Sequence, residues 1–212
     1  MKDIAIFPTQ YGVASLILRE IPYRGEAYIR VQDVQPGELP FLLKECADFC
    51  RACGAETIFW TGVDQDIEPD MTVLRMQGSA WVDEGLLQQL FPVTAATAGK
   101  WRNIYNERMR GVPQATTLSF SDEPRLIESS GAYFIHQAGE LLGIGWLDGS
   151  HLLAIASCKP GSGAQIFHTM MSLIPGEEMT LEVADQNQKA IDLYKRMGFI
   201  ATGIVSKWYL LK

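Results

Sequence analysis

The C-terminal part of the chain reads Leu181-Glu182-Val183 and then, after a short break, Asn187-Gln188-Lys189-Ala190-Ile191-Asp192-Leu193-Tyr194-Lys195-Arg196-Met197-Gly198-Phe199. Apolar residues recur at helical spacing from Ala190 to Met197, which predicts one buried helix face. An Asp or Asn side chain can cap the helix start, and Gly198 can end it in a left-handed conformation. The pattern therefore predicts a strand, a capped helix and a second strand.

A glycine-rich segment lies upstream of this stretch. The apolar run Leu152–Ser157 is typical of a buried strand, and it leads into Cys158-Lys159-Pro160-Gly161-Ser162-Gly163-Ala164-Gln165. Apolar residues at helical spacing follow from Ile166 onward, so the turn opens a packed helix. Backbone amides at a helix start can hold a pyrophosphate, and glycines let it approach closely. We expect the amides of residues 162–165 to be available for this.

Together the two segments resemble the Gcn5-related N-acetyltransferase (GNAT) family, in which an Asn, an Ala, a Leu-Tyr pair and a Gly-Phe pair recur in this order. The resemblance implies an α/β fold with a mixed sheet, the GNAT acyl-CoA N-acyltransferase fold. It implies an enzyme that transfers an acetyl group from acetyl-CoA, the co-substrate, to a primary amine of a small molecule or peptide in a ternary complex. No metal is expected.

The resemblance also assigns roles to residues. Tyr194 matches the position that supplies a proton to the departing thiolate. The remaining cofactor contacts would come from the strand backbone, which pairs with the pantetheine arm, from the glycine-rich turn, and from the residue at the bend before the last helix: Ile155, Ala156, Ser157, Gly161, Ser162, Gly163, Ala164, Gln165 and Asn187.

The turn departs from the family pattern at two positions. Cys158 stands where the family has Arg or Gln, and Pro160 lacks an N–H that could face a phosphate. Lys159 can compensate in part as a point charge. These departures leave a second hypothesis open, a non-catalytic GNAT-like module that binds a CoA ester or a small metabolite.

The sequence does not identify the general base. His151, Asp148 and Glu182 are candidates near the expected cleft, but polar residues at strand ends are usually satisfied surface groups. His168 lies in the helix after the turn and is expected to face solvent. A covalent acyl-enzyme on Cys158 is a less favoured alternative, although a helix start can lower a thiol pKa.

The acceptor is equally open. The helix expected from about residue 100 to 110 usually borders the acceptor site in the family. Its residues Trp101, Ile104 and Tyr105 first of all form a packing face, and Arg102 or Asn106 could contact an acceptor carboxylate.

Composition narrows the function classes. The chain has 212 residues, 47% of them hydrophobic, and a net charge of −7. An acidic surface disfavours nucleic acid and anionic membranes as partners and attracts an amine. The apolar run at the start is too short for a signal peptide, and no apolar stretch has membrane-spanning length, so a cytoplasmic location is expected. The oligomeric state is not predicted.

Three cysteines share one predicted helix. Cys46, Cys50 and Cys53 have the spacing that some radical enzymes use for an iron–sulfur cluster, but they also repeat at helical intervals with Leu42 and Phe49. We favour the second interpretation, an apolar seam of free thiols in a reducing compartment.

The predicted elements divide the chain into two domains. Residues 89–212 follow the GNAT order, with a polar loop expected around 119–125. Residues 1–88 contain a strand at 27–31, a helix at 38–53 and a strand at 56–60, which repeat the strand–helix–strand core of the second half. We interpret this half as a degenerate GNAT-like lobe in a pseudo-tandem chain, without a nucleotide of its own.

Overall fold

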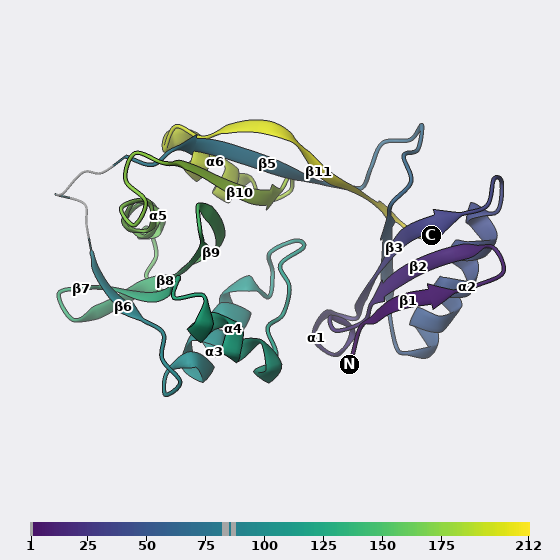
Figure 1. Ribbon diagram of the computed structural model, residues 1–212, viewed down its shortest axis with the longest axis horizontal. Coiled ribbons are helices and arrows are strands. Elements are labelled where there is room, and N and C mark those ends of the chain that lie inside the picture. The colour runs from purple at the N-terminus through teal and green to yellow at the C-terminus, as the bar shows by residue number, and fades with distance from the viewer. Residues whose placement is uncertain (1, 82–84, 86–87) are drawn as a thin grey trace. The chain divides into compact units, whose positions relative to one another are not determined.

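The computed structural model describes residues 2–81, 85 and 88–212, which form two compact units (Figure 1). Unit 1 comprises residues 1–73 and 204–212, and unit 2 comprises residues 74–203. The expected boundary between residues 88 and 89 lies instead inside unit 2. The reason is that two long strands pass from one unit into the other, so unit 1 combines two separate segments of the chain, whereas unit 2 is one continuous segment.

Unit 1 is a sheet covered by one long helix. Its strand order is β1-β2-β3-β4-β11, with α2 packed on β2 and β3. The elements are β1 (Ile4–Pro8), β2 (Gly12–Ile17), α1 (Ile21–Arg24), β3 (Glu26–Val34), α2 (Leu39–Ala52), β4 (Thr57–Thr61), the first part of β5 (Met71–Ser79) and the end of β11 (Ile200–Leu210). The strand, helix and strand predicted for this half are all present.

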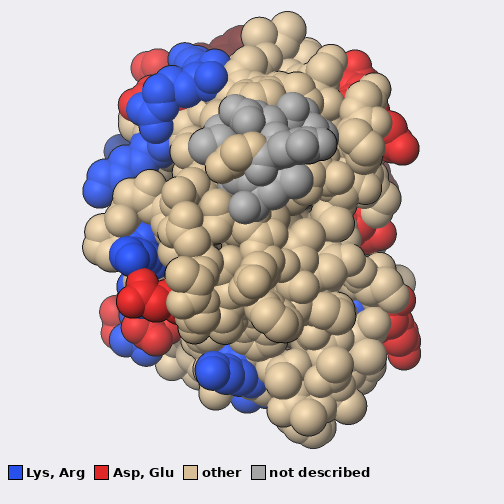
Figure 2. Space-filling model, turned by 90° about the vertical axis from the view of Figure 1, so that its left-hand side faces the viewer, with Lys and Arg blue, Asp and Glu red and all other residues tan. Residues whose placement is uncertain are grey.

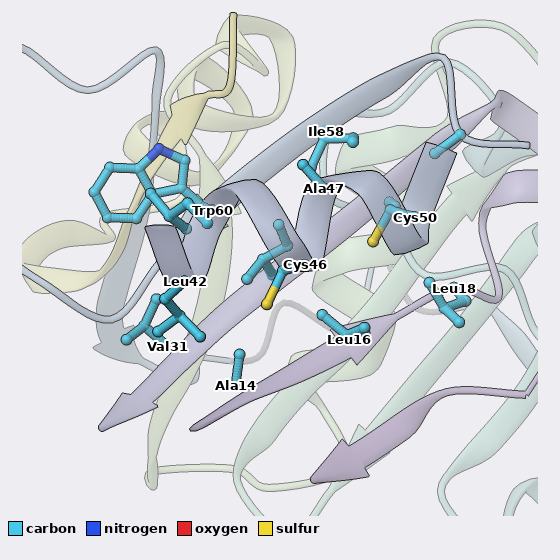
Figure 3. Packing of buried hydrophobic residues seen from close by; sticks show 14 of the residues in the cluster. Ala14, Leu16, Leu18, Val31, Leu42, Cys46, Ala47, Cys50, Ile58 and Trp60 are labelled. Atoms are coloured by element: carbon cyan, nitrogen blue, oxygen red, sulfur yellow. The ribbon is translucent and has the colours of Figure 1, made fainter. Parts of the chain in front are cut away.

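The core of unit 1 contains the cysteines of α2. Cys46 and Cys50 are fully buried, and Figure 3 shows both side chains among Leu16, Leu18 and Leu42 between the helix and the sheet. Burial raises the pKa of Cys46 to about 11 and that of Cys50 to about 12. The thiols are therefore packed as neutral apolar groups. No cluster of metal-binding side chains occurs among the described residues.

Unit 2 is a larger mixed sheet in the order β11-β5-β10-β9-β8-β7-β6. Besides the shared strands, its elements are β6 (Gln89–Pro92), α3 (Ala98–Met109), η2 (Phe120–Asp122), α4 (Glu123–Glu128), β7 (Ala132–Gln137), β8 (Glu140–Asp148), β9 (His151–Ser157), α5 (Gly163–Met171), β10 (Glu178–Ala184) and α6 (Gln188–Arg196). The segment expected as a polar loop around 119–125 is partly helical. Its Ser119 and Asp122 form a reciprocal capping box, which stabilises such a start.

Helices cover both faces of this sheet. One face packs on α5 and α6 through Ile166, Phe167 and Tyr194, and the other packs on α3 and α4 through Trp101 and Leu126. Close packing needs glycines in two strands: a Cβ at Gly145 would lie 2.4 Å from the sulfur of Met170, and one at Gly78 would lie 2.7 Å from the ring of Phe199. The two layers hold β9 and β10 in the middle of the unit.

Charged side chains are sparse at the centre of the face in Figure 2, where Lys and Arg lie along the left margin together with some Asp and Glu, and further Asp and Glu lie along the right margin. No helix in the described ranges is long and apolar enough to cross a bilayer.

Candidate functional site

The two parallel strands at the centre of unit 2 separate soon after they begin to pair. β9 and β10 are paired at only two positions, His151 with Thr180 and Leu152 with Leu181. The antiparallel ladder of β9 with β8 shifts its register at the next step: Leu147 pairs with Leu152 and Trp146 with Ala154, which leaves Leu153 as an extra residue. A β-bulge bends its strand and increases the local twist. The bulge at Leu153 therefore explains why β9 leaves β10.

Past the bulge, β9 has a ladder partner on one side only. Residues Ile155, Ala156 and Ser157 pair with β8 through Gly145, Ile144 and Gly143. On the β10 side no ladder continues in the described part of the chain. Backbone groups along this edge need partners, since buried N–H and C=O groups are nearly always hydrogen-bonded. This edge can accept an extended polar ligand.

A second bulge anchors the glycine-rich turn. In β8 the register shift between Ile135 and His136 makes Leu142 the extra residue. The carbonyl oxygen of Leu142 accepts hydrogen bonds from the backbone N–H of Cys158 at 2.7 Å and of Lys159 at 3.2 Å. This anchor could not be predicted from the sequence, because the interaction uses only the backbone of Leu142, which has the pattern of an ordinary strand residue.

Ser162 closes the same turn. Its side chain is buried, and its Oγ lies 2.7 Å from the carbonyl oxygen of Lys159 and 3.2 Å from that of Leu142. Its backbone N–H donates to the Lys159 oxygen at 3.3 Å. The expectation that the Ser162 amide is available is therefore wrong, because the amide is used within the turn.

The start of α5 has three backbone N–H groups without a partner within the helix. Gly163, Ala164 and Gln165 are its first three residues, whose N–H groups have no carbonyl one turn earlier in the helix. The chain reaches this start through Gly161, whose φ of +83° is the left-handed conformation that glycine adopts most easily. A Cβ at Gly163 would lie 3.5 Å from Leu193 of α6, which is ordinary contact. The helix start is thus next to α6.

Tyr194 lies between α5 and α6. Its ring packs 5.2 Å from that of Phe167, centroid to centroid, and only 8% of the residue is exposed. Its hydroxyl makes no hydrogen bond to another residue of the described chain. Burial raises its pKa to about 12, so the phenol is a neutral proton donor at physiological pH. A buried donor without a protein acceptor can serve a ligand atom.

Asn187 caps α6. Its side-chain oxygen accepts a hydrogen bond from the Ala190 N–H at 3.3 Å. This cap places Asn187 at the bend after β10.

The departures in the turn have structural consequences. Lys159 forms an ion pair with Glu140 of β8 at 2.8 Å, so its charge is already engaged. At Cys158 burial raises the thiol pKa, and the neighbouring Arg108 of α3 lowers it without cancelling that effect. A protonated thiol is a poor nucleophile, which weakens the covalent alternative.

The candidate bases do not gather at the turn. His151 opens β9 and Asp148 closes β8, and six residues at about 3.3 Å each separate His151 from Ser157. His151 Nδ1 is 2.9 Å from Thr180 Oγ1, and Asp148 lies 3.7 Å from Arg125. Glu182 lies 3.6 Å from Arg75. All three side chains are thus paired, and none lies at the turn: His151 and Asp148 lie at the opposite end of β9, and Glu182 lies on β10.

Helix α3 is used mainly for packing. Trp101 is fully buried and donates from Nε1 to the Tyr133 carbonyl at 3.0 Å. Asn106 bonds both the N–H and the C=O of Leu118, and Arg102 pairs with Glu123 at 2.9 Å. The two residues expected as acceptor contacts therefore hold the α3–α4 connection. The prediction that His168 faces solvent is wrong, because α5 is buried on all sides over residues 166–171. The His168 ring is fully buried and packs against Trp81.

No protein-family model matches the sequence, and no curated protein matches it. Solved structures do. A GCN5-related N-acetyltransferase from Sphaerobacter thermophilus superposes with a TM-score of 0.60 at 13% identity, over 94% of this chain and 76% of that one. Another from Anabaena variabilis gives 0.62 at 11% identity, over 94% of this chain and 59% of that one.

A third similar structure, a protein of unknown function from Staphylococcus epidermidis, gives a TM-score of 0.58 at 11% identity and covers all of this chain and 94% of its own. Identities this low show the fold alone. The chain has the fold of the GCN5-related N-acetyltransferases, as the resemblance predicted, and its acceptor is a separate question because one fold serves many reactions.

Proposed function

We propose that this chain, which has the fold of the GCN5-related N-acetyltransferases, transfers an acetyl group from acetyl-CoA to a primary amine. The observation that carries the proposal is the opening between β9 and β10 past Leu153, with a helix start at the end of the same strand. An unpaired strand edge suits the amide groups of a pantetheine arm, and the helix start suits a pyrophosphate.

The residues of unit 2 would divide the work as follows. The amides of Gly163, Ala164 and Gln165 bind the pyrophosphate, and the β9 edge from Ile155 to Ser157 orients the thioester. A β9 N–H donates to the thioester oxygen as a neutral amine attacks the carbonyl carbon. The C–S bond then breaks, and Tyr194 gives its proton to the departing sulfur. The amine proton leaves to solvent, and Tyr194 is reprotonated from solvent.

The net charge of −7 favours a cationic acceptor, a primary amine on a small molecule or peptide. Such an amine must lose a proton before it attacks. Since the three candidate bases have other partners, we propose that water at the open edge accepts this proton.

The test is calorimetric titration of acetyl-CoA into the protein and two variants at one position. Gly163→Glu places bulk and a negative charge at the phosphate position, and we expect it to abolish binding. Gly163→Ala is the matched control, because a Cβ there meets only ordinary contacts. We expect Gly163→Ala to bind as the parent does, with one acetyl-CoA per chain.

Release of free thiol with a panel of amines then separates the two hypotheses. Binding that Gly163→Glu abolishes, with turnover of at least one amine, supports the enzyme. The same binding without turnover would identify the non-catalytic module. Equal binding by Gly163→Glu and the parent would show that the turn is not the phosphate site.

A further inference from the structure

Unit 1 contains a pocket of about 410 Å³ that plays no part in the proposed acetyl transfer. It lies beside α2, where Leu39, Leu43 and Ala47, spaced four residues apart, form one stripe of the helix. Trp60 of β4 and Leu211 after β11 complete its apolar lining. The volume falls in the range of small-molecule sites, which is about 300–1,000 Å³.

The architecture explains why the pocket is open. In unit 2 the strand β10 leads into α6, which joins α5 in covering one face of the sheet. In unit 1 the equivalent strand β4 leads through a loop into β5, so α2 packs alone on β2 and β3. The sheet face at β4 and β11 has no second helix among the described elements. The pocket lies at this flank of α2.

The charges around this pocket have one sign. Three of the chain's 18 Lys and Arg residues line it, namely Lys44, Arg51 and Lys212, and none of its 25 Asp and Glu residues does. The chain as a whole is acidic, so this local reversal favours an anion. Lys44 and Arg51 share one exposed partner, Asp48, at 2.7 and 3.6 Å. Exposed ion pairs contribute little, so a bound anion can compete for both cations.

We propose that this pocket binds a small amphipathic anion, a molecule with an apolar chain or ring and one carboxylate. The apolar body lies against Leu43, Ala47 and Trp60, and the carboxylate lies between Lys44 and Arg51. The helix flank fixes the spacing of the two cations, which are seven residues apart and so lie on one face. The proposal is independent of the acetyl transfer proposed for unit 2.

The experiment uses the full chain and three probes at low ionic strength: decanoate, the neutral decanol and the cationic decyltrimethylammonium. Amide and indole shifts in ¹H–¹⁵N spectra report the site, with the Trp60 indole as the marker. We expect decanoate to shift the signals of Leu43, Ala47, Trp60 and Leu211, which line the pocket, in a saturable way. Decanol should bind more weakly at the same place, and the cationic probe should not bind there.

The matched variants are Lys44→Gln with Arg51→Gln, and Arg30→Gln as the control. The double variant removes two of the three cations at the pocket, those between which the carboxylate is placed, and we expect the decanoate affinity to fall about tenfold with decanol unchanged. Arg30 is an exposed cation of the same unit that does not line the pocket, and its loss should leave both affinities unchanged.

Three results would overturn the proposal. Decanol could bind as tightly as decanoate, the double variant could keep the parent affinity, or the shifts could map to the exposed rings of Phe41 and Phe49 instead. In addition, the Trp60 signal without any probe should not depend on protein concentration; if it does, a second copy of the chain covers the pocket and the proposal is also overturned. Thermal unfolding of each variant verifies that the fold is retained.

Discussion

Each unit contains one strand–helix–strand segment with parallel strands, and the two differ in how far those strands stay together. In unit 1, β3 and β4 pair over five residues, from Glu26 with Thr57 to Arg30 with Thr61. In unit 2, β9 and β10 pair over two. The same local motif therefore forms a closed sheet in one unit and an open edge in the other.

The position of a bulge accounts for the difference. β3 also contains an extra residue, since Val13 pairs with Asp33 and Ala14 with Val31, which leaves Gln32 over. This bulge follows the last pair with β4, near the end of β3. In β9 the bulge at Leu153 comes two residues after the strand begins. The parallel ladder ends just before the bulge in both units, so the bulge sets how much strand edge remains open.

The helix starts also differ in a way that favours a ligand site in unit 2 and disfavours one in unit 1. α5 opens with Gly163 and Ala164, whereas α2 has Glu38 at its N-cap and Pro40 in its first turn. An acid at a helix start occupies the position that would favour a phosphate. The comparison teaches that two copies of one motif need not form the same site, and four experiments test it.

The largest effect is expected from Tyr194→Phe. The variant keeps the ring beside Phe167 and removes the proton that we assign to the departing thiolate. A positioned acid contributes about 10²–10⁴-fold in rate. We expect kcat to fall by at least the lower figure with unchanged calorimetric affinity for acetyl-CoA. Unchanged turnover, with an amine the parent accepts, would make Tyr194 a packing residue like those of unit 1.

Deletion of Leu153 should make unit 2 resemble unit 1. Leu152 packs toward α5 and α6, Ala154 toward α3 and α4, and Ile155 toward α5 and α6 again, so removal of Leu153 restores regular alternation. The strand can then continue pairing with β10. We expect acetyl-CoA affinity to fall by about a hundredfold.

Circular dichroism and thermal unfolding must show that the deletion variant is folded. Deletion of Gln32 in β3 is the matched control, and it should leave acetyl-CoA binding as it is in the parent. A folded Leu153 deletion that binds normally would show that the bulge does not open the site.

Tyr28→Phe tests whether the buried tyrosines of the two units contribute differently to the free energy of unfolding. Tyr28 of β3 is buried and donates to the Glu26 carboxylate at 2.6 Å, and burial together with this bond raises its pKa. Tyr194 has no such acceptor. Hydrogen bonds to charged groups contribute about 1.5–3 kcal/mol, so Tyr28→Phe should lower the free energy of unfolding by about 1.5 kcal/mol. Urea unfolding should show little change for Tyr194→Phe, and equal losses would contradict the contrast.

The smallest effect concerns thiol labelling. Cys46 and Cys50 have pKa values raised to about 11 and about 12 by burial, so they stay protonated below pH 10. A disulfide reagent at pH 8 should modify the partly exposed Cys53 and Cys158 and reach the other two only on unfolding. Fast reaction of all four cysteines would mean that α2 does not seal the core of unit 1.

The sequence determined most of the local structure. Apolar spacing located α2, α5 and α6, and Gly161, Gly163 and Asn187 marked the turn and the cap in the places where the structure has them. These features depend on neighbours within a few residues. The same information separated the cysteine seam from a metal site, because a helical period and burial go together.

Only the tertiary structure decided what depends on pairing between distant strands. The bulges at Leu142 and Leu153 read as ordinary strand, and they become visible only when β8 is placed against β7 and β9. The unit boundary and the burial of His168 likewise follow from which strands and helices meet. The pattern of side chains along a segment predicts which face of a helix or strand is buried. The pairing register of a strand is instead set by a partner strand that lies far away in the sequence.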